Sequence, residues 1–276
     1  MSYEAEISRS NPSAFLFLID MSGSMTDPYA GGKRKADGVA DAINKLLSNL
    51  SIKCTKSEGV RDYYEVGVIS YGKQVQPALG GELSGQALAT ISNVANHPAR
   101  IEERTKKEDD GAGGVADIQV KFPVWFDPKA AGSTPMCKAF KLAHETLKPW
   151  VDAHKYSFPP IVINITDGES TDGDPTPDAA AVRELATQDG NALLFNCHIS
   201  NAQGSSVLFA DAEEGLPDQF AKLLFNMSSV LPDAIRDGAQ GAGFPVSDGS
   251  RGFAFNADLV ELIRFLDIGT RPSNMR

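Results

Sequence analysis

Cysteine is scarce in this chain, and its few copies follow no pattern typical of metal sites or disulfide frameworks. Cys54, Cys137 and Cys197 are widely spaced, odd in number and without Cys-x-x-Cys spacing. This argues against a disulfide-stabilised secreted fold and against a structural zinc site. A reducing compartment is the simpler interpretation, so we expect a cytoplasmic protein.

Long apolar runs are also missing from the sequence, and we expect no signal peptide. The N-terminal residues Met1 to Pro12 have neither the basic start nor the apolar centre of a secretory signal. No apolar run approaches the roughly 20 residues that a transmembrane helix needs. We therefore expect no membrane partner.

Positively charged residues are also few in comparison with acidic residues. The chain has 26 Lys and Arg residues against 36 Asp and Glu residues, which gives a formal net charge of −10. An acidic protein is a poor partner for nucleic acid or for an anionic membrane surface. A neutral or basic protein surface fits better.

The residues that are present favour a large α/β domain. With 276 residues and 42% hydrophobic content, the chain can bury one full core. Strand-like apolar segments alternate with amphipathic helical segments, which predicts a doubly wound, mostly parallel sheet flanked by helices. The predicted strands are 14–19, 63–71, 161–166 and 191–199, with short ones at 73–79 and 207–209. The predicted helices lie at about 34–50, at 86–95, after Pro135 and ending before Pro149, through 180–186, from 216 to 227 and around 259–266.

Two segments are predicted to be loops. The charged run Glu102 to Asp110, followed by Gly111 to Gly114, has little apolar content, so we expect an exposed insertion at about 96–122. A solvated loop is the simpler interpretation, and a partner-recognition element is the alternative. A Gly-rich loop is expected at about 238–252.

A short apolar run ends in three oxygen-bearing side chains. Ala14 to Ile19 is uninterrupted and rich in Phe and Leu, which is typical of a strand buried on both faces. Asp20, Ser22 and Ser24 follow it directly. In open parallel sheets, ligands lie beyond the carboxyl ends of the strands. One carboxylate and two hydroxyls suit a hard cation such as Mg2+ better than Zn2+.

Two later loops carry further oxygen ligands. Thr134 precedes Pro135, a helix-start pattern in which the threonine would cap the helix at its first residue, Pro135. Asp167 follows the predicted strand 161–166 and precedes Gly168, which on its own indicates a turn. The remaining acidic residues of this third loop, up to Asp174, are expected to form a solvated rim.

These three loops resemble those of one known family. Asp20-Met-Ser22-Gly-Ser24 resembles the Asp-x-Ser-x-Ser signature of von Willebrand factor A (VWA) domains, where it forms most of a metal-ion-dependent adhesion site (MIDAS). Gly-Ser-Thr134-Pro and Thr-Asp167-Gly resemble the second and third metal loops, although Ser133 stands where many members have Gly. The resemblance implies a single VWA domain over residues 12–268. It also implies a metal site of Asp20, Ser22, Ser24, Thr134 and Asp167, holding Mg2+, with Mn2+ and Ca2+ as alternatives.

The resemblance also implies a function. In this family a partner's Asp or Glu completes the coordination of the metal, so we expect a protein-protein interaction module. The chain is similar in length to stand-alone bacterial cytoplasmic VWA proteins, some of which accompany tellurite-resistance or stress systems. It has no ATPase motif of its own, so an ATPase, kinase or phosphatase partner would be encoded separately.

Two alternatives remain open. A metal-dependent phosphohydrolase with an aspartyl nucleophile would need a second acid two residues after Asp20, where Ser22 stands. None of the four histidines is next to the proposed ligands in sequence, and His198 is interpreted as structural. We therefore expect no enzyme activity. The other alternative is a scaffold whose metal is purely structural.

Overall fold

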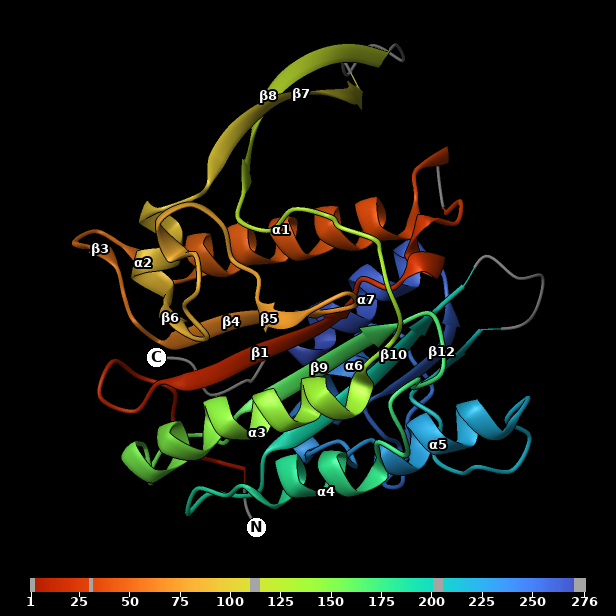
Figure 1. The fold of residues 1–276 in the computed structure, drawn as a ribbon. Coiled ribbons are helices and arrows are strands. Elements are labelled where there is room, and N and C mark those ends of the chain that lie inside the picture. The colour runs from red at the N-terminus through yellow and green to blue at the C-terminus, as the bar shows by residue number, and fades with distance from the viewer. Residues whose placement is uncertain (1–2, 30–31, 110–114, 201–205, 271–276) are drawn as a thin grey trace.

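The computed structural model describes residues 3–29, 32–109, 115–200 and 206–270. A central eight-stranded sheet runs through these residues, with helices on both faces (Figure 1). Its strands lie in the order β11 (Val207–Leu208), β12 (Phe253–Ala257), β10 (Leu193–Ile199), β9 (Ile161–Thr166), β1 (Ser13–Asp20), β4 (Tyr64–Tyr71) and β5 (Val75–Pro77), while β6 (Ala89–Thr90) also pairs with β4.

The centre of this sheet is parallel. β1 pairs in parallel with both β4 and β9, and β10 pairs in parallel with β9 and β12. Antiparallel pairing is confined to the short strands β5, β6 and β11. The predicted mostly parallel α/β sheet flanked by helices is therefore confirmed.

Helices bury both faces of the sheet. Successive side chains of β1 alternate between two cores: Phe15 and Phe17 belong to one, and Leu16 and Leu18 to the other. The first core is covered by α1 (Lys35–Lys53), α2 (Ile91–Asn96), α6 (Asp233–Gly241) and α7 (Leu259–Gly269). The second is covered by α3 (Met136–Ala153), α4 (Thr176–Glu184) and α5 (Gln219–Met227). Every residue of β1 is buried, as its continuous apolar sequence predicts.

Some element boundaries differ from the prediction. α3 begins at Met136, with Pro135 rather than Thr134 at the cap, and it continues through Pro149 to Ala153. α6 extends to Gly241, so the expected Gly-rich loop at 238–252 begins as the end of a helix. The strand that follows it, β12, was not predicted. Short 3-10 turns, η1 (Gly23–Thr26) and η3 (Gly81–Leu83), lie in loops.

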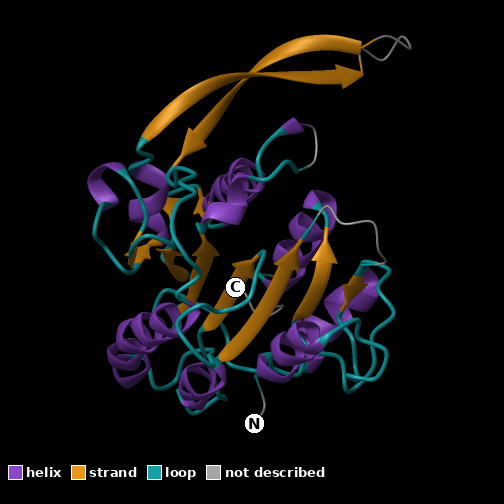
Figure 2. Ribbon diagram, turned by 45° about the vertical axis from the view of Figure 1, so that its right-hand side comes forward, coloured by secondary structure: helices purple, strands orange, loops and turns teal. Residues whose placement is uncertain are grey.

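The charged insertion is not the solvated loop that we expected. β7 (Arg100–Asp109) and β8 (Val115–Val124) pair along their whole length as an antiparallel hairpin outside the main sheet. Figures 1 and 2 show it projecting past α1 as a twisted two-stranded arm. Residues 110–114 of the expected loop lie outside the described residues.

The base of this arm is fixed to α1. The Arg104 guanidinium lies 3.6 Å from the centroid of the Phe122 ring, and its Nη1 lies 2.7 Å from Oδ1 of Asp41 on α1. These contacts explain why a highly charged segment forms strands there, because its charges pair with one another and with α1. A second, small hairpin joins β2 (Thr55–Lys56) to β3 (Gly59–Val60).

Within the described ranges, none of the helices combines the length and the apolar character that crossing a bilayer requires.

Candidate metal centre at the carboxyl edge of the sheet

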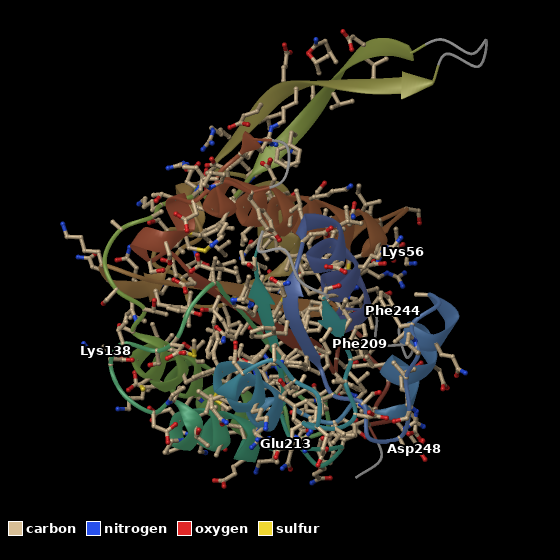
Figure 3. All side chains as sticks on the ribbon, turned by 90° about the vertical axis from the view of Figure 1, so that its right-hand side faces the viewer. Lys56, Lys138, Phe209, Glu213, Phe244 and Asp248 are labelled. Carbon is tan, nitrogen blue, oxygen red and sulfur yellow. The ribbon has the colours of Figure 1, made fainter. Side chains whose placement is uncertain are left out.

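Three loops meet where the central parallel strands end. β1 and β9 are neighbours in register, with Ile19 opposite Ile165, so the segments that follow them emerge side by side. Asp20 ends β1, and Asp167 follows the last residue of β9. Figure 3 faces this edge of the molecule, with Lys138 marking the start of α3 beside it. The topology therefore brings the first and third predicted metal loops together.

Hydrogen bonds join four of the predicted ligands into one group. The backbone N–H of Ser22 donates to Oδ1 of Asp20 at 2.8 Å. The hydroxyl oxygens of Ser22 and Ser24 are 3.0 Å apart, and the Ser24 hydroxyl donates to Oδ1 of Asp167 at 2.7 Å. Ser22 is buried whereas Ser24 is exposed, so the group opens to solvent on the Ser24 side.

Asp20 lies at the buried end of this group and has no surface accessible to solvent. The Thr166 hydroxyl donates to its Oδ2 at 2.8 Å. Burial raises the pKa of Asp20 to about 6, against the lowering effect of the hydrogen bonds from Ser22 and Thr166, and nearby Asp167 raises it further. A buried carboxylate with a raised pKa is a group that a cation would stabilise.

Thr134 belongs to the second loop, which packs between the other two. The Gly23 N–H in the first loop donates to the Gly132 carbonyl at 3.0 Å. Thr134 and Thr171 of the third loop exchange two hydrogen bonds, one from each backbone N–H, both at 2.9 Å. Thr134 is buried. Among the described residues, however, no hydrogen bond joins its hydroxyl to the other four predicted ligands.

Gly132 allows the second loop to lie close to the backbone of Lys73. Its φ is +90°, in the left-handed region, and an added Cβ would lie 2.6 Å from the backbone nitrogen of Lys73. Glycine tolerates both constraints because it has no Cβ. The positive φ and the close contact with Lys73 therefore both require glycine at position 132.

Asp172 has a role that the sequence did not reveal. Its carboxylate accepts the backbone N–H groups of Cys137 at 3.0 Å and of Lys138 at 3.1 Å, the free donors of the first turn of α3. Burial raises the pKa of Asp172, but the hydrogen bonds from these backbone groups and from the Ser170 and Cys137 side chains outweigh that effect, and the net shift is downward. Asp172 therefore caps α3 from the third loop while it remains exposed to solvent, as expected for the acidic rim of this loop. No local sequence signal marks this contact, because 34 residues separate Asp172 from Lys138.

Lys35 was also missed. It is the first residue of α1, and its Nζ lies 2.9 Å from Oδ2 of Asp167 and 3.6 Å from Oδ2 of Asp27. Its side chain is only 11% exposed, and that of Asp167 is 0% exposed. A cation therefore contacts one of the predicted metal ligands directly.

His198 is close to this edge but is occupied. Its Nδ1 accepts the backbone N–H of Asn256 at 3.2 Å, and its ring also hydrogen-bonds the backbone of Asp167. The ring stacks on Phe255 with centroids 4.3 Å apart. Burial lowers the pKa of His198 to about 4, so the ring is neutral at physiological pH. The geometry supports the structural role expected for it.

The donor set fits a hard cation. The described residues contain no cluster of three or more His, Cys, Asp and Glu side chains suited to a metal, so any ion here would rely on hydroxyls and two carboxylates. The side-chain oxygens of Ser22 and Ser24 are 3.0 Å apart, and those of Ser24 and Asp167 are 2.7 Å apart. Adjacent oxygens around an octahedral Mg2+ at 2.1 Å are separated by about 3 Å, so this spacing is compatible with such an ion.

Comparison with known proteins finds solved structures with a similar fold. No family model matches the sequence, and no curated protein matches it. The proximal thread matrix protein 1 from the mussel byssus, solved with a zinc-occupied MIDAS motif, is similar over 96% of this chain, with a TM-score of 0.51 and 14% identity. The pilus adhesin SpaC from Lactobacillus rhamnosus GG is similar over 96% of this chain, with a TM-score of 0.52 and 14% identity.

The likeness covers only part of those proteins. The chain spans 48% of the mussel protein and 31% of the pilus adhesin. At 14% identity, the likeness concerns the fold alone. Together with the sheet order and the two helical layers, it supports a VWA fold for this chain.

Proposed function

We propose that this protein is a divalent-cation-dependent protein-interaction module. The observation that carries the proposal is the hydrogen-bonded oxygen set of Ser22, Ser24 and Asp167, assembled from two distant loops at the open edge of a VWA-like sheet. Such a set contains few carboxylates for a divalent ion. An ion held there would keep much of its positive charge for an incoming ligand.

Asp20, Ser22, Ser24, Thr134 and Asp167 would hold the ion. Mg2+ is the proposed cation, because all five side chains offer hard oxygen donors, with Mn2+ and Ca2+ as alternatives. When bound, the ion would supply an electrophilic centre for a carboxylate. The protein's own contribution is to fix the three loops: the second is bonded to the first through Gly23 and to the third through Thr171.

The partner would be another protein that offers an Asp or Glu. The chain's net charge of −10 makes nucleic acid and anionic membranes poor partners. Its resemblance to stand-alone bacterial VWA proteins supports a cytoplasmic role in a multi-protein stress or tellurite-resistance system. A separately encoded ATPase, kinase or phosphatase is a candidate partner in that setting.

The test is capture of partners from a lysate of the source organism with Mg2+ and with EDTA. Ser24→Ala removes an exposed ligand hydroxyl. Ser92→Ala is the matched control, since the Ser92 hydroxyl hydrogen-bonds that of Thr90, which is not one of the proposed ligands. We expect one set of partners to be captured with Mg2+, and to be lost with EDTA and in Ser24→Ala but not in Ser92→Ala. Thermal melting of each variant verifies folding.

The opposite result identifies the alternatives. Equal capture in EDTA and in Ser24→Ala would contradict the proposal and favour a scaffold whose metal is structural. Attention would then move to the β7–β8 arm, which projects from the domain and carries the charged run that begins at Glu102 (Figure 2).

A further inference from the structure

Lys35 is unusual among the lysines of this protein. Of the lysines whose side chains the structure describes, it is the only one that is buried. Its Nζ is 2.9 Å from Oδ2 of Asp167, whose Oδ1 accepts the Ser24 hydroxyl at 2.7 Å. The Asp167 carboxylate therefore contacts both the Lys35 ammonium and a hydroxyl of the group proposed to bind a divalent ion.

We propose that Lys35 competes with the divalent cation for Asp167, so that it weakens metal binding and strengthens carboxylate binding at the loaded site. This inference rests on the proposed function, because it concerns the same site. It adds a specificity-determining residue that none of the sequence motifs contains.

Competition follows from the position of the ammonium. The Asp167 side chain is 0% exposed and the Lys35 side chain 11% exposed, so water screens their interaction little. A divalent ion bound to Asp167 would meet a like charge close by. The site must either tolerate this repulsion or move the ammonium toward Asp27, its other partner at 3.6 Å. Either change weakens binding of the ion.

The effect on the partner has the opposite sign. The buried charges of the site are the carboxylates of Asp20 and Asp167 and the ammonium of Lys35. A divalent ion leaves this set with one excess positive charge, which an incoming carboxylate neutralises. Without the ammonium, the ion alone would neutralise the two aspartates, and the carboxylate would gain less. Asp27 is 60% exposed, so solvent screens its charge.

A purely structural role for Lys35 predicts different behaviour. If the ammonium only held Asp167 in place, its removal would disorder that carboxylate. Metal affinity would then fall or stay the same. The direction of the change in affinity therefore separates the two roles.

The experiment measures Mn2+ binding to the full chain by electron paramagnetic resonance, with Mg2+ as a competitor. Lys35→Met removes the charge, and Lys35→Gln removes it while keeping a hydrogen-bond donor. Lys35→Arg keeps the charge. Lys33→Met is the matched control, because Lys33 pairs with Asp41 and is 53% exposed. A second readout is the water-proton relaxivity of bound Mn2+ during titration with acetate, which falls as a carboxylate replaces water.

We expect Lys35→Met and Lys35→Gln to bind Mn2+ about ten-fold more tightly than the unaltered protein, the change typical of one nearby charge. Lys35→Arg should stay within about three-fold, and Lys33→Met should be unchanged. Acetate should bind the Mn2+-loaded Lys35→Met more weakly. Melting in EDTA should show a lower midpoint for Lys35→Met, because Asp167 loses its counter-ion, and a larger gain on adding Mn2+.

The outcomes distinguish this inference from the proposed function. If the unaltered protein binds Mn2+ and Lys35→Met and Lys35→Gln bind it equally or more weakly, the inference is wrong while the metal site stands. If none of the proteins binds Mn2+ at 10 mM, both are wrong. If Lys35→Met fails to fold, Lys35→Gln decides the question by the same criterion.

Discussion

The Ser24 hydroxyl donates to Oδ1 of Asp167 at 2.7 Å, although 143 residues separate them. The contact exists because β1 and β9 are adjacent and parallel, so the loops that follow them leave the sheet at one edge. The loop after β1 and the loop after β9 thereby contribute oxygen atoms to one candidate metal site.

Divalent metal should stabilise the protein. With a dissociation constant of about 1 mM, 10 mM Mg2+ would add about 1.4 kcal/mol and raise the melting midpoint by about 3 °C. Asp167→Ala should abolish this gain, because it removes a proposed ligand. Differential scanning calorimetry with Mg2+ and with EDTA measures it. An equal gain in Asp167→Ala would place the bound ion elsewhere.

Asp20→Asn should stabilise the metal-free protein at pH 7 by about 1–2 kcal/mol. Burial raises the folded-state pKa of Asp20 to about 6 from 3.8, so the stability linked to its protonation is present below pH 3.8 and is lost as the pH rises through 6. The amide keeps both contacts: its oxygen accepts the Ser22 N–H, and its nitrogen faces Thr166. The Thr166 hydroxyl can then donate to Gly168, whose carbonyl is 2.8 Å away.

Urea unfolding in EDTA at pH 7 and at pH 4 tests this prediction. The difference between Asp20→Asn and the unaltered protein should be largest at pH 7 and nearly vanish at pH 4, where the carboxyl is protonated. At pH 7, 10 mM Mg2+ should largely cancel the difference, because only the unaltered protein gains the roughly 1.4 kcal/mol of metal stabilisation. If Asp20→Asn is less stable than the unaltered protein in EDTA at pH 7, the prediction is wrong. The charge of the Asp20 carboxylate would then already be compensated by a partner in the folded protein.

Asp172→Ala should weaken both α3 and the metal site. It removes the acceptor of the Cys137 and Lys138 N–H groups, which should cost about 1 kcal/mol. Thr134 is hydrogen-bonded to Thr171, the residue before Asp172, so we also expect weaker Mn2+ binding. Asp174→Ala is the matched control, because Asp174 lies in the same loop and accepts the N–H of Thr176 in α4. Equal Mn2+ affinities for the two variants would confine Asp172 to a helix-capping role.

The strands that position this site could be predicted from the sequence, because the first is a continuous apolar run and the second a nearly continuous one. Ala14 to Ile19 and Ile161 to Thr166 have compositions that only burial on both sheet faces satisfies. The polar residues after them then follow from the topology of a parallel sheet. The motif and the fold thus support each other at Asp20 and Asp167.

What could not be predicted depends on contacts between distant segments. The charged β7–β8 segment forms strands because Arg104 meets Phe122 across the hairpin and Asp41 on α1, none of which local composition reveals. Lys35 and Asp172 look like ordinary surface residues in the sequence. Their roles arise only when α1 and the third loop pack against partners 132 and 35 residues away.

Gly132→Ala should destabilise the second loop more than a glycine substitution elsewhere. At Gly132 an added methyl would meet the Lys73 backbone at 2.6 Å as well as a φ of +90°. Gly215→Ala is the matched control, because its φ is +88° and nothing lies within 4 Å of the added Cβ. We expect a loss of about 2–4 kcal/mol at Gly132 and about 1 kcal/mol at Gly215. Equal losses in chemical unfolding would show that backbone strain alone acts at both.

Finally, the purified protein should not hydrolyse p-nitrophenyl phosphate or nucleotides at a metal-dependent rate. Such chemistry needs a proton-transfer group beside the metal and nucleophile. Ser22 stands where a phosphohydrolase with an aspartyl nucleophile carries its second acid. Nδ1 of the nearby His198 accepts the N–H of Asn256, and burial lowers the pKa of His198 to about 4. Release of p-nitrophenol is measured with Mg2+, with Mn2+ and with EDTA, alongside Asp20→Ala prepared identically. Turnover that requires metal and disappears in Asp20→Ala would contradict the interaction-module proposal and favour an enzyme, whereas turnover equal in both preparations would identify a contaminating phosphatase.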